Sequence, residues 1–388
     1  MLRRWKNRLR WRDFVITTGW ILFIPSNVNA DEPTTRLTAT QAQAWKQITD
    51  SGLEYLQSSG QDSSGSLSPE VGPGITALAV TAAIRLGRPV DDAFVAKGLS
   101  ALEGFVKPDG GIYGSGRLRN YETCVAMLCF SEANASGKYN KILQDAKKFV
   151  TDIQFGSTRS PDDPWYGGVG YSGTERPDLS NTSYFIEALR STEEGPDSES
   201  IQRALAFVSR CQNLASEGND TEFAGLVGDG GFYYVVPKEK VDPSTSPERY
   251  TENGGLRSYG SMTYAGLKSM IYAGLTPEDP RVKSAVQWIE NHYDVTANPG
   301  MGDAGLFYYY HTFAASLSTA NVDTITTEDG QNHAWRSELI AHLGATQNPD
   351  GSWSNRNARW FEDNKNLATS FALLALAHCK PAKSKGDK

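Results

Sequence analysis

Residues that build metal sites and disulfide frameworks are scarce in this sequence. Its 388 residues include four cysteines and five histidines, and no two cysteines form a Cys-x-x-Cys pair. Cys124 and Cys129 fall in one expected helix, with a spacing that turns them to different faces, so we do not expect them to pair with each other. We expect four buried free thiols, with a bond from Cys129 to Cys211 or Cys379 as the open alternative.

Long apolar runs are scarce as well, and the one that stands out lies at the N-terminus. A basic segment up to Arg12 is followed by an apolar run over residues 14–25 and by the small-residue sequence Val28-Asn29-Ala30. This order is typical of an export signal, and the run is short for a membrane-spanning helix. We predict a signal peptide over residues 1–30, an exported mature chain in the periplasm or outside the cell, and a disordered tail over residues 381–388.

Positive charge is in deficit outside this N-terminal segment. The whole chain has a net charge of −7, and without residues 1–30 it has 32 basic against 44 acidic side chains. An acidic body does not attract nucleic acid, so we expect no nucleic-acid partner. An anionic small ligand would need a local group of basic side chains. Peripheral association with a membrane stays open, and the sequence identifies no partner protein.

What the sequence does contain is a recurring unit. Its clearest copy runs from Leu339 to Trp353, where a helix ends and Gln347-x-x-x-Gly351-x-Trp353 forms a glycine-rich turn closed by an aromatic side chain. Each copy has an aromatic and an aliphatic residue at the end of a helix, and the aliphatic anchors are Leu56, Val106, Val150, Val208, Ile289 and Leu343. A period of about fifty residues is typical of helical-pair repeats that stack on one another.

One more apolar helix is expected in each unit. These helices begin near Pro73, Asn120, Ser180, Ser261, Leu306 and Asn366. Several are apolar or small on all sides, whereas several of the anchor helices have a charged face. We therefore predict an all-α fold, an (α/α)6 toroid of six inner and six outer helices in a single domain over residues 31–380. Three long loops, at 156–177, 217–256 and 321–333, should emerge near the starts of inner helices.

The Gln-x-x-x-Gly-x-Trp pattern resembles the repeat of squalene and hopene cyclases. The six helix pairs resemble the α/α toroid that those enzymes share with protein prenyltransferase β subunits. This similarity to the terpenoid cyclase and protein prenyltransferase superfamily covers residues 38–379. The resemblance implies a toroid with a central aromatic cavity that binds a hydrophobic, lipid-like or isoprenoid-like ligand.

The catalytic motifs of these families are incomplete in this chain. Where the cyclases have Asp-x-Asp-Asp to protonate an alkene, the nearest segment is Ser160-Pro161-Asp162-Asp163, which we interpret as an acidic turn. Where the prenyltransferases hold zinc, Asn181 and Ser183 stand in place of Asp and Cys, and only the segment around His311 is similar. A single imidazole cannot hold zinc alone, so we predict no metal and no other cofactor. Whether the protein is an enzyme stays open.

Two kinds of side chain are candidates for binding a ligand. Arginines precede several inner helices, where the helix dipole adds to anion attraction, unless they pair with neighbouring acids. Aromatic side chains suit an isoprenoid chain, unless they pack between repeats. The ligand-binding candidates are Arg119, Arg176, Arg257, Trp165, Tyr166, Tyr184, Tyr264, Tyr310 and Trp353.

The catalytic candidates are three polar residues at or near inner helices. Asp303 leads into a tyrosine-rich helix, His311 lies within that helix, and Glu122 is an acid inside an apolar helix. Glu187 is a second acid of this kind. For His311, a hydrogen-bonded wall residue is the alternative, and for Asp303 a turn former.

Three functions fit these observations. The first is an exported relative of the cyclases that binds a lipid or isoprenoid, with or without chemistry. The second is a non-catalytic scaffold whose long loops bind a peptide or an envelope component. The third is a carbohydrate-active α/α barrel that uses Asp303, Glu122 or Glu187 as paired acids across an aromatic cleft.

Overall fold

The computed structural model describes residues 37–156, 159–173, 175–238 and 242–381. The predicted signal peptide and all but the first residue of the predicted tail lie outside the described residues. The described residues belong to one compact unit, Thr34–Lys388. No helix in this part of the chain is both long enough and apolar enough to cross a bilayer.

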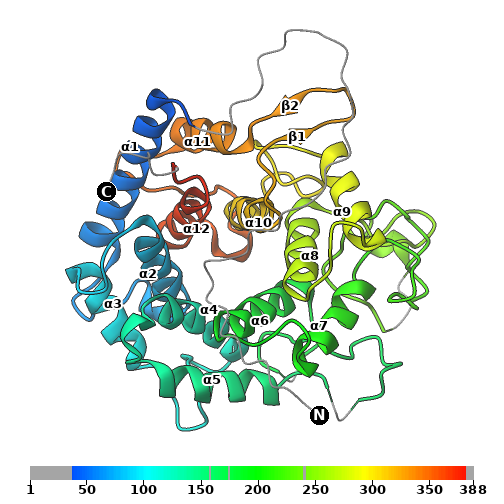
Figure 1. Cartoon of the computed structure of the whole chain (residues 1–388), viewed down its shortest axis with the longest axis horizontal. Coiled ribbons are helices and arrows are strands. Elements are labelled where there is room, and N and C mark those ends of the chain that lie inside the picture. Colours follow the sequence, from blue (N-terminus) through cyan, green and yellow to red (C-terminus); the bar gives the residue numbers. More distant parts are fainter. Residues whose placement is uncertain (1–36, 157–158, 174, 239–241, 382–388) are drawn as a thin grey trace, which may run out of the picture. The chain divides into compact units, whose positions relative to one another are not determined.

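The described residues form an inner and an outer ring of helices (Figure 1). The inner helices are α2 (Gly74–Leu86), α4 (Arg119–Glu132), α6 (Leu179–Ser191), α8 (Gly260–Tyr272), α10 (Leu306–Thr319) and α12 (Lys365–Ala377). The outer helices are α1 (Ala39–Tyr55), α3 (Ala93–Glu103), α5 (Asn140–Asp152), α7 (Glu199–Arg210), α9 (Pro280–Asn291) and α11 (Trp335–Thr346). Each inner helix packs on the next, and α12 packs on α2, which closes the ring. The prediction of an all-α toroid is confirmed.

Short helical turns and one small sheet lie in the connections between helices. The 3-10 turns are η2 (Pro69–Val71), η3 (Asn134–Ser136), η4 (Pro243–Thr245) and η5 (Arg359–Phe361), and a single π-helical turn, η1 (Leu56–Gly60), extends α1. Strands β1 (Ile325–Thr326) and β2 (Asn332–His333) pair antiparallel, with Ile325 opposite His333. This small sheet occupies the predicted long loop at 321–333.

The burial pattern of each helix explains whether it lies in the inner or in the outer ring. Every residue of α2 from Gly74 to Ala83 is buried, and so is every residue of α12 from Leu367 to Leu376. By contrast, α5 buries only Leu143, Ala146, Phe149 and Val150, which share one helical face. A helix that is apolar or small on all sides needs neighbours on all sides, so it takes the inner position.

A recurring glutamine connects one unit to the next. The Nε2 atom of Gln154 donates to the Gly167 carbonyl of its own turn (2.8 Å) and to the Ser200 carbonyl at the start of α7 (2.9 Å). Gln61 and Gln212 make the same double contact with α3 and α9. Gln347 donates to Gly351 and to Ile48 of α1, both at 2.9 Å, so the last unit is bonded to the first.

The four cysteines Cys124, Cys129, Cys211 and Cys379 are buried and free. This confirms the expectation of buried thiols and leaves the alternative bond from Cys129 unformed. Burial raises the pKa of each thiol, so all four stay protonated and unreactive at neutral pH.

Candidate functional site

Aromatic rings from four inner helices meet inside the ring. Tyr184 of α6 stacks on His311 of α10 with ring centroids 6.3 Å apart, and His311 stacks on Phe371 of α12 at 5.8 Å. Tyr121 of α4 lies edge-on to Tyr184 at 5.4 Å, and Tyr308 lies edge-on to Phe371 at 5.8 Å. We call these five residues the aromatic cluster. They join helices that are up to about 250 residues apart in sequence, which only ring closure brings together.

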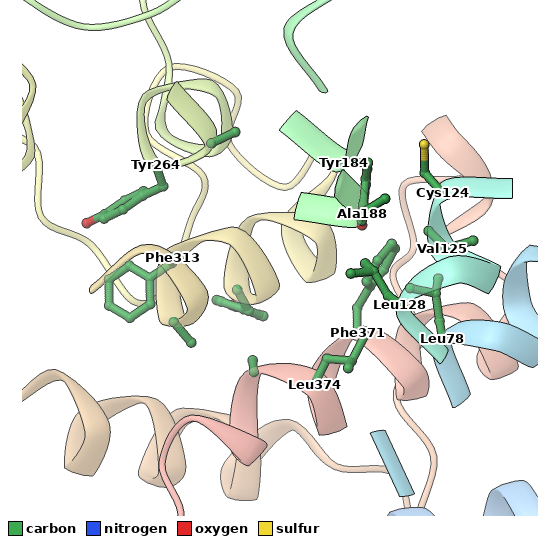
Figure 2. Close-up of a cluster of buried hydrophobic side chains, with 14 of the residues drawn as sticks. Leu78, Cys124, Val125, Leu128, Tyr184, Ala188, Tyr264, Phe313, Phe371 and Leu374 are labelled. Carbon is green, nitrogen blue, oxygen red and sulfur yellow. The ribbon is translucent and has the colours of Figure 1, made fainter. Parts of the chain in front are cut away.

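Aliphatic side chains extend this apolar surface. Leu78 of α2, Leu128 of α4 and Leu374 of α12 are buried and lie in the same group as Phe371 (Figure 2). Figure 2 also shows Tyr264 and Phe313 as a separate group, away from these leucines. The aromatic cluster is therefore bordered by aliphatic side chains of the inner helices.

A buried ion pair lies close to the aromatic cluster. The Lys268 ammonium of α8 is 2.6 Å from Glu187 Oε2 of α6, and the two side chains are 2% and 8% exposed. Burial raises the pKa of Glu187, but the charges of Lys268 and Arg85 outweigh it and lower that pKa to about 2. Arg85 in turn pairs with the more exposed Glu132 at 2.8 Å. We call Arg85, Glu132, Glu187 and Lys268 the charged group.

His311 connects the aromatic cluster to the charged group. Its ring is 3% exposed, and its Nδ1 atom has no hydrogen-bond partner among the described residues. Burial lowers the pKa of His311 well below its ordinary value, and the nearby Lys268 lowers it further. His311 is therefore a neutral imidazole at neutral pH, next to an ion pair that stays charged.

A second acid, which the sequence analysis did not single out, lies at the start of α6. Asp178 is buried, and its two carboxylate oxygens accept hydrogen bonds from the backbone and side-chain nitrogens of Asn181, both at 2.8 Å. Burial raises the pKa of Asp178 to about 6, although Asn181 and the Tyr234 hydroxyl favour its ionised form. Its position before a helix was the only sequence signal, and that signal indicates a helix cap.

The three predicted catalytic residues do not come together. Glu122 is buried at the start of α4, where its Oε2 accepts from the Gly114 backbone at 2.9 Å, and burial raises its pKa. Asp303 is exposed in a turn and accepts from Asn357 at 2.9 Å. Only His311 belongs to the aromatic cluster. The acids of the carbohydrate-active hypothesis are therefore engaged at separate places, with Glu187 committed to Lys268.

The predicted arginines mostly hold loop backbone. Arg119 donates to the Ser172 carbonyl at 2.5 Å, and Arg257 donates to two carbonyls of its own loop, both at 3.0 Å. Arg176 is exposed and lies near enough to Asp178 to lower its pKa. These contacts explain how the long loops are held in place, and they leave Arg119 and Arg257 with acceptors already bound.

The predicted aromatic residues fall into three places. Tyr184 alone lies in the aromatic cluster. Three others pack between the inner and outer helices. Tyr264 lies against Phe313, with ring centroids 5.1 Å apart. The Tyr310 hydroxyl is 2.8 Å from His342 Nε2 of α11, and Trp353 Nε1 donates to the Leu343 carbonyl. Trp165 and Tyr166 belong to the loop over α7, where Trp165 Nε1 donates to the Val236 carbonyl.

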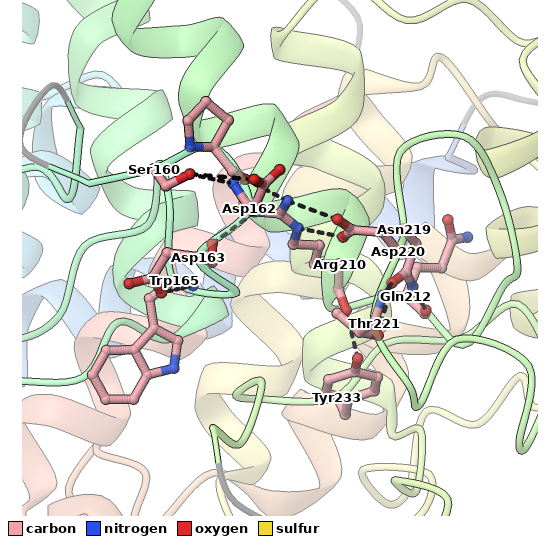
Figure 3. Close-up of polar contacts among 11 residues, drawn as sticks. Ser160, Asp162, Asp163, Trp165, Arg210, Gln212, Asn219, Asp220, Thr221 and Tyr233 are labelled. Atoms are coloured by element: carbon pink, nitrogen blue, oxygen red, sulfur yellow. Dashed lines mark hydrogen bonds and ion pairs between the residues drawn. The ribbon is translucent and has the colours of Figure 1, made fainter.

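The segment around Asp163 is an ion-paired turn on the outer side of the ring (Figure 3). Arg210 of α7 donates to the carbonyls of Pro161 (2.7 Å) and Asp163 (3.0 Å) and pairs with Asp220 at 2.8 Å. Burial raises the pKa of Asp163, but the Trp165 backbone amide, Lys238 and Arg159 outweigh it and lower that pKa. This segment does not supply a neutral acid, in agreement with its interpretation as an acidic turn.

A pocket of about 320 Å³ lies beside this turn, on the outer side. It is lined by Tyr166 and Arg210 together with Pro161, Gln202, Leu205, Ala206, Ser209, Glu217, Gly218, Asp220 and Arg281. Arg210 already has three partners here, Asp220 and the carbonyls of Pro161 and Asp163.

The residues at the zinc position of the prenyltransferases do not fit a metal. Asn181 bonds to Asp178, and the Ser183 hydroxyl lies 3.4 Å from the Ala265 carbonyl. Among the described residues, no three His, Cys, Asp or Glu side chains group closely enough to hold a metal ion. No step through zinc follows from this arrangement.

Comparisons with known proteins point to the cyclases. No protein-family model matches the sequence. Drimenyl diphosphate synthase of Streptomyces showdoensis is 23% identical over 295 residues, which are 74% of this chain and 45% of that enzyme. The chain thus spans less than half the length of this relative.

Solved structures extend the comparison to the fold. A type II terpene cyclase from Scytonema, in complex with its substrate geranylgeranyl dihydroxybenzoate, superposes with a TM-score of 0.52 at 13% identity, over 88% of this chain and 99% of that one. The same cyclase without ligand also gives a TM-score of 0.52, over 89% and 99% of the two chains.

The fold of this chain is therefore that of the terpenoid cyclase-like superfamily, as the sequence resemblance indicated.

Proposed function

We propose that this protein binds a prenyl or isoprenoid chain inside the ring, against the aromatic cluster. The observation that carries this proposal is the contact series from Tyr121 through Tyr184 and His311 to Phe371, which brings rings from four inner helices together in the interior. Flat, polarisable rings and the nearby leucines match the unsaturated hydrocarbon of an isoprenoid. The Scytonema cyclase, which shares the fold, binds a prenylated substrate.

We further propose binding without protonation of an alkene. That reaction needs a carboxylic acid that stays neutral in an apolar site. The carboxyl group electrostatically coupled to His311 is Glu187, and Lys268 keeps it ionised. The segment that corresponds to the acid motif of the cyclases is an ion-paired turn. The catalytic motifs of the related enzymes are thus replaced by residues that suit binding.

We also propose that the protein is exported and contacts a membrane at its surface. The basic and apolar N-terminal sequence supports export. Two large apolar side chains, Trp360 (41% exposed) and Phe361 (65% exposed), lie next to Arg359 and support surface contact with lipid. Fusion of residues 1–30 to a reporter enzyme that is active only outside the cytoplasm tests export, and an inactive fusion contradicts it.

Binding is tested by native mass spectrometry with farnesol, using two tyrosine variants. Tyr184→Ala removes a ring of the aromatic cluster, and Tyr264→Ala removes an equally buried ring between the two helix layers. Both residues are tyrosines of inner helices with nearly the same burial, so the variants are closely matched. We expect Tyr184→Ala to weaken binding about tenfold and Tyr264→Ala to leave it nearly unchanged. Equal losses, or no binding by the unmodified protein, would contradict the proposal.

A further inference from the structure

We propose that Lys268 and His311 bind the polar head of the prenyl ligand, and that this head is a neutral hydroxyl rather than a diphosphate or a carboxylate. The inference rests on the proposed function, because it concerns the polar end of the same site. Three features of the described residues carry it: a buried ion pair near the aromatic cluster, a balance of charge, and hydrogen-bonding atoms without partners.

The charged group consists of two ion pairs that differ in exposure, and the more buried pair influences the pKa of His311 in the aromatic cluster. The side chains are 37% exposed at Glu132, 21% at Arg85, 8% at Glu187 and 2% at Lys268. The pKa of His311 responds to Glu187, Lys268 and Arg85, so the imidazole lies within electrostatic range of the more buried pair. Polar groups next to apolar and aromatic side chains match an amphiphilic ligand.

The charges of the charged group already balance. Two cations, Arg85 and Lys268, each pair with one anion, Glu132 and Glu187. A carboxylate or diphosphate bound here would add negative charge in a buried site without a free cation, which is costly. A hydroxyl adds no charge. The charge balance therefore favours a neutral head.

The free hydrogen-bonding capacity matches a hydroxyl. The Lys268 ammonium has three donors, and the described residues supply one side-chain acceptor, Glu187. His311 Nδ1 and the Tyr184 hydroxyl are buried and have no hydrogen-bond partner in the part of the chain that the structure describes. A hydroxyl both accepts and donates, so it can accept from Lys268 and donate to a neutral imidazole nitrogen. A buried polar atom that lacks a partner in the free protein gains one when such a head binds.

The arginines near the starts of inner helices do not offer a better place for a diphosphate. Arg119 and Arg257 donate to loop carbonyls, and Arg359 stacks on Trp360 with its guanidinium 4.4 Å from the ring centroid. A diphosphate needs several converging free donors. These side chains lie on separate segments of the chain and already have contacts within the protein.

The test compares one farnesyl chain with four heads: farnesol, farnesyl methyl ether, farnesoate and farnesyl diphosphate. Binding of each to the full chain is measured by native mass spectrometry at neutral pH. We expect farnesol to bind about tenfold more tightly than the methyl ether, which lacks the donor, and more tightly than both anions. Tighter binding of the diphosphate or of farnesoate overturns the assignment.

Two variants locate the head. His311→Phe preserves the stack between Tyr184 and Phe371 and removes the nitrogens, so it should abolish the preference for farnesol over its methyl ether and still bind both. The double variant Lys268→Met with Glu187→Leu removes both charges together and should weaken the binding of both compounds, because both oxygens accept from Lys268, while the preference for farnesol remains. Unchanged binding of both compounds by the double variant also overturns the assignment. A preference that survives in His311→Phe overturns the head-group assignment. Failure of all four compounds to bind refutes the proposed function instead.

Discussion

Replacing Lys268 with methionine should destabilise the protein strongly at neutral pH. Methionine has a similar length but no charge, so Glu187 would be left as a buried carboxylate without its ammonium partner. In the unmodified protein the pKa of Glu187 falls from 4.5 to about 2. Such a difference corresponds to about 3 kcal/mol of favourable interaction with the ionised form. Removal of one member of a buried ion pair typically costs about 3–5 kcal/mol, so we expect a loss in that range.

Urea unfolding followed by circular dichroism measures this loss. The control is the double variant Lys268→Met with Glu187→Leu, which removes both charges and should recover most of the stability. A single variant that loses less than about 1 kcal/mol would refute the assignment of a buried, charged pair. So would a double variant that is less stable than the single one, because the second substitution should relieve an unpaired charge.

The pH dependence of stability provides an independent check, because it should have opposite signs in the unmodified protein and in Lys268→Met. A lowered pKa means that the pair contributes its full stability above pH 4.5 and loses it as the pH falls toward 2. Without Lys268, burial should dominate and raise the pKa of Glu187, although Arg85 partly opposes this. Lys268→Met should therefore gain stability relative to the unmodified protein as the pH falls from 7 to 4. Parallel pH curves for the two proteins would contradict this reasoning.

Three further substitutions test other parts of the structure. The raised pKa of Asp178 means that protonation of this group stabilises the unmodified protein by up to about 3 kcal/mol as the pH falls from above 6 to about 4. Asp178→Asn should remove this gain in unfolding free energy, and an unchanged pH profile contradicts the prediction. Gln212→Ala leaves two backbone carbonyls without their donor and should cost about 1–3 kcal/mol in urea unfolding, whereas no loss would mean that the inter-unit bonds are dispensable. Gly72→Ala places a methyl group against the Glu122 carboxylate and should lower the free energy of unfolding more than Gly302→Ala does. Gly302 also has a positive φ, but an added methyl group there meets no described atom within 4 Å. Equal losses of unfolding free energy would mean that the contact with Glu122 is relieved at no cost.

The fold was predictable because its signals are local and repeated. Each glycine-rich turn after an anchor residue ends an outer helix, and the doubly apolar helices mark the inner ring. The contacts that hold each turn on the inner helix after it were not visible in the sequence. Each of Thr76, Thr123, Thr182, Thr263 and Thr369 accepts a hydrogen bond from a turn backbone amide through its hydroxyl. A threonine early in a helix gives no sequence signal of that role.

The site was harder to predict because inner helices are buried on every side. Tyr184 and Tyr264 occupy similar positions in consecutive inner helices and are almost equally buried. One lies in the aromatic cluster and the other packs on Phe313. Counted from the threonine that binds the preceding turn, Tyr184 is two residues on and Tyr264 is one, and one residue turns a helical side chain by about 100°. The ion pair joins residues 81 positions apart. A lysine within an otherwise apolar helix was a usable sign that a buried anion faces it, since such charges are rarely buried alone.

The arrangement of acids agrees with the proposal that this chain binds an isoprenoid without protonating an alkene. A neutral carboxylic acid is needed beside the substrate alkene, and burial alone would make one of Glu187. Lys268 reverses that effect and keeps the group ionised. Asp178 has the raised pKa that such an acid requires, but both of its oxygens are bonded to Asn181. In the proposed function, Lys268 of α8 thus keeps Glu187 from acting as a proton donor and offers its ammonium group to a polar head.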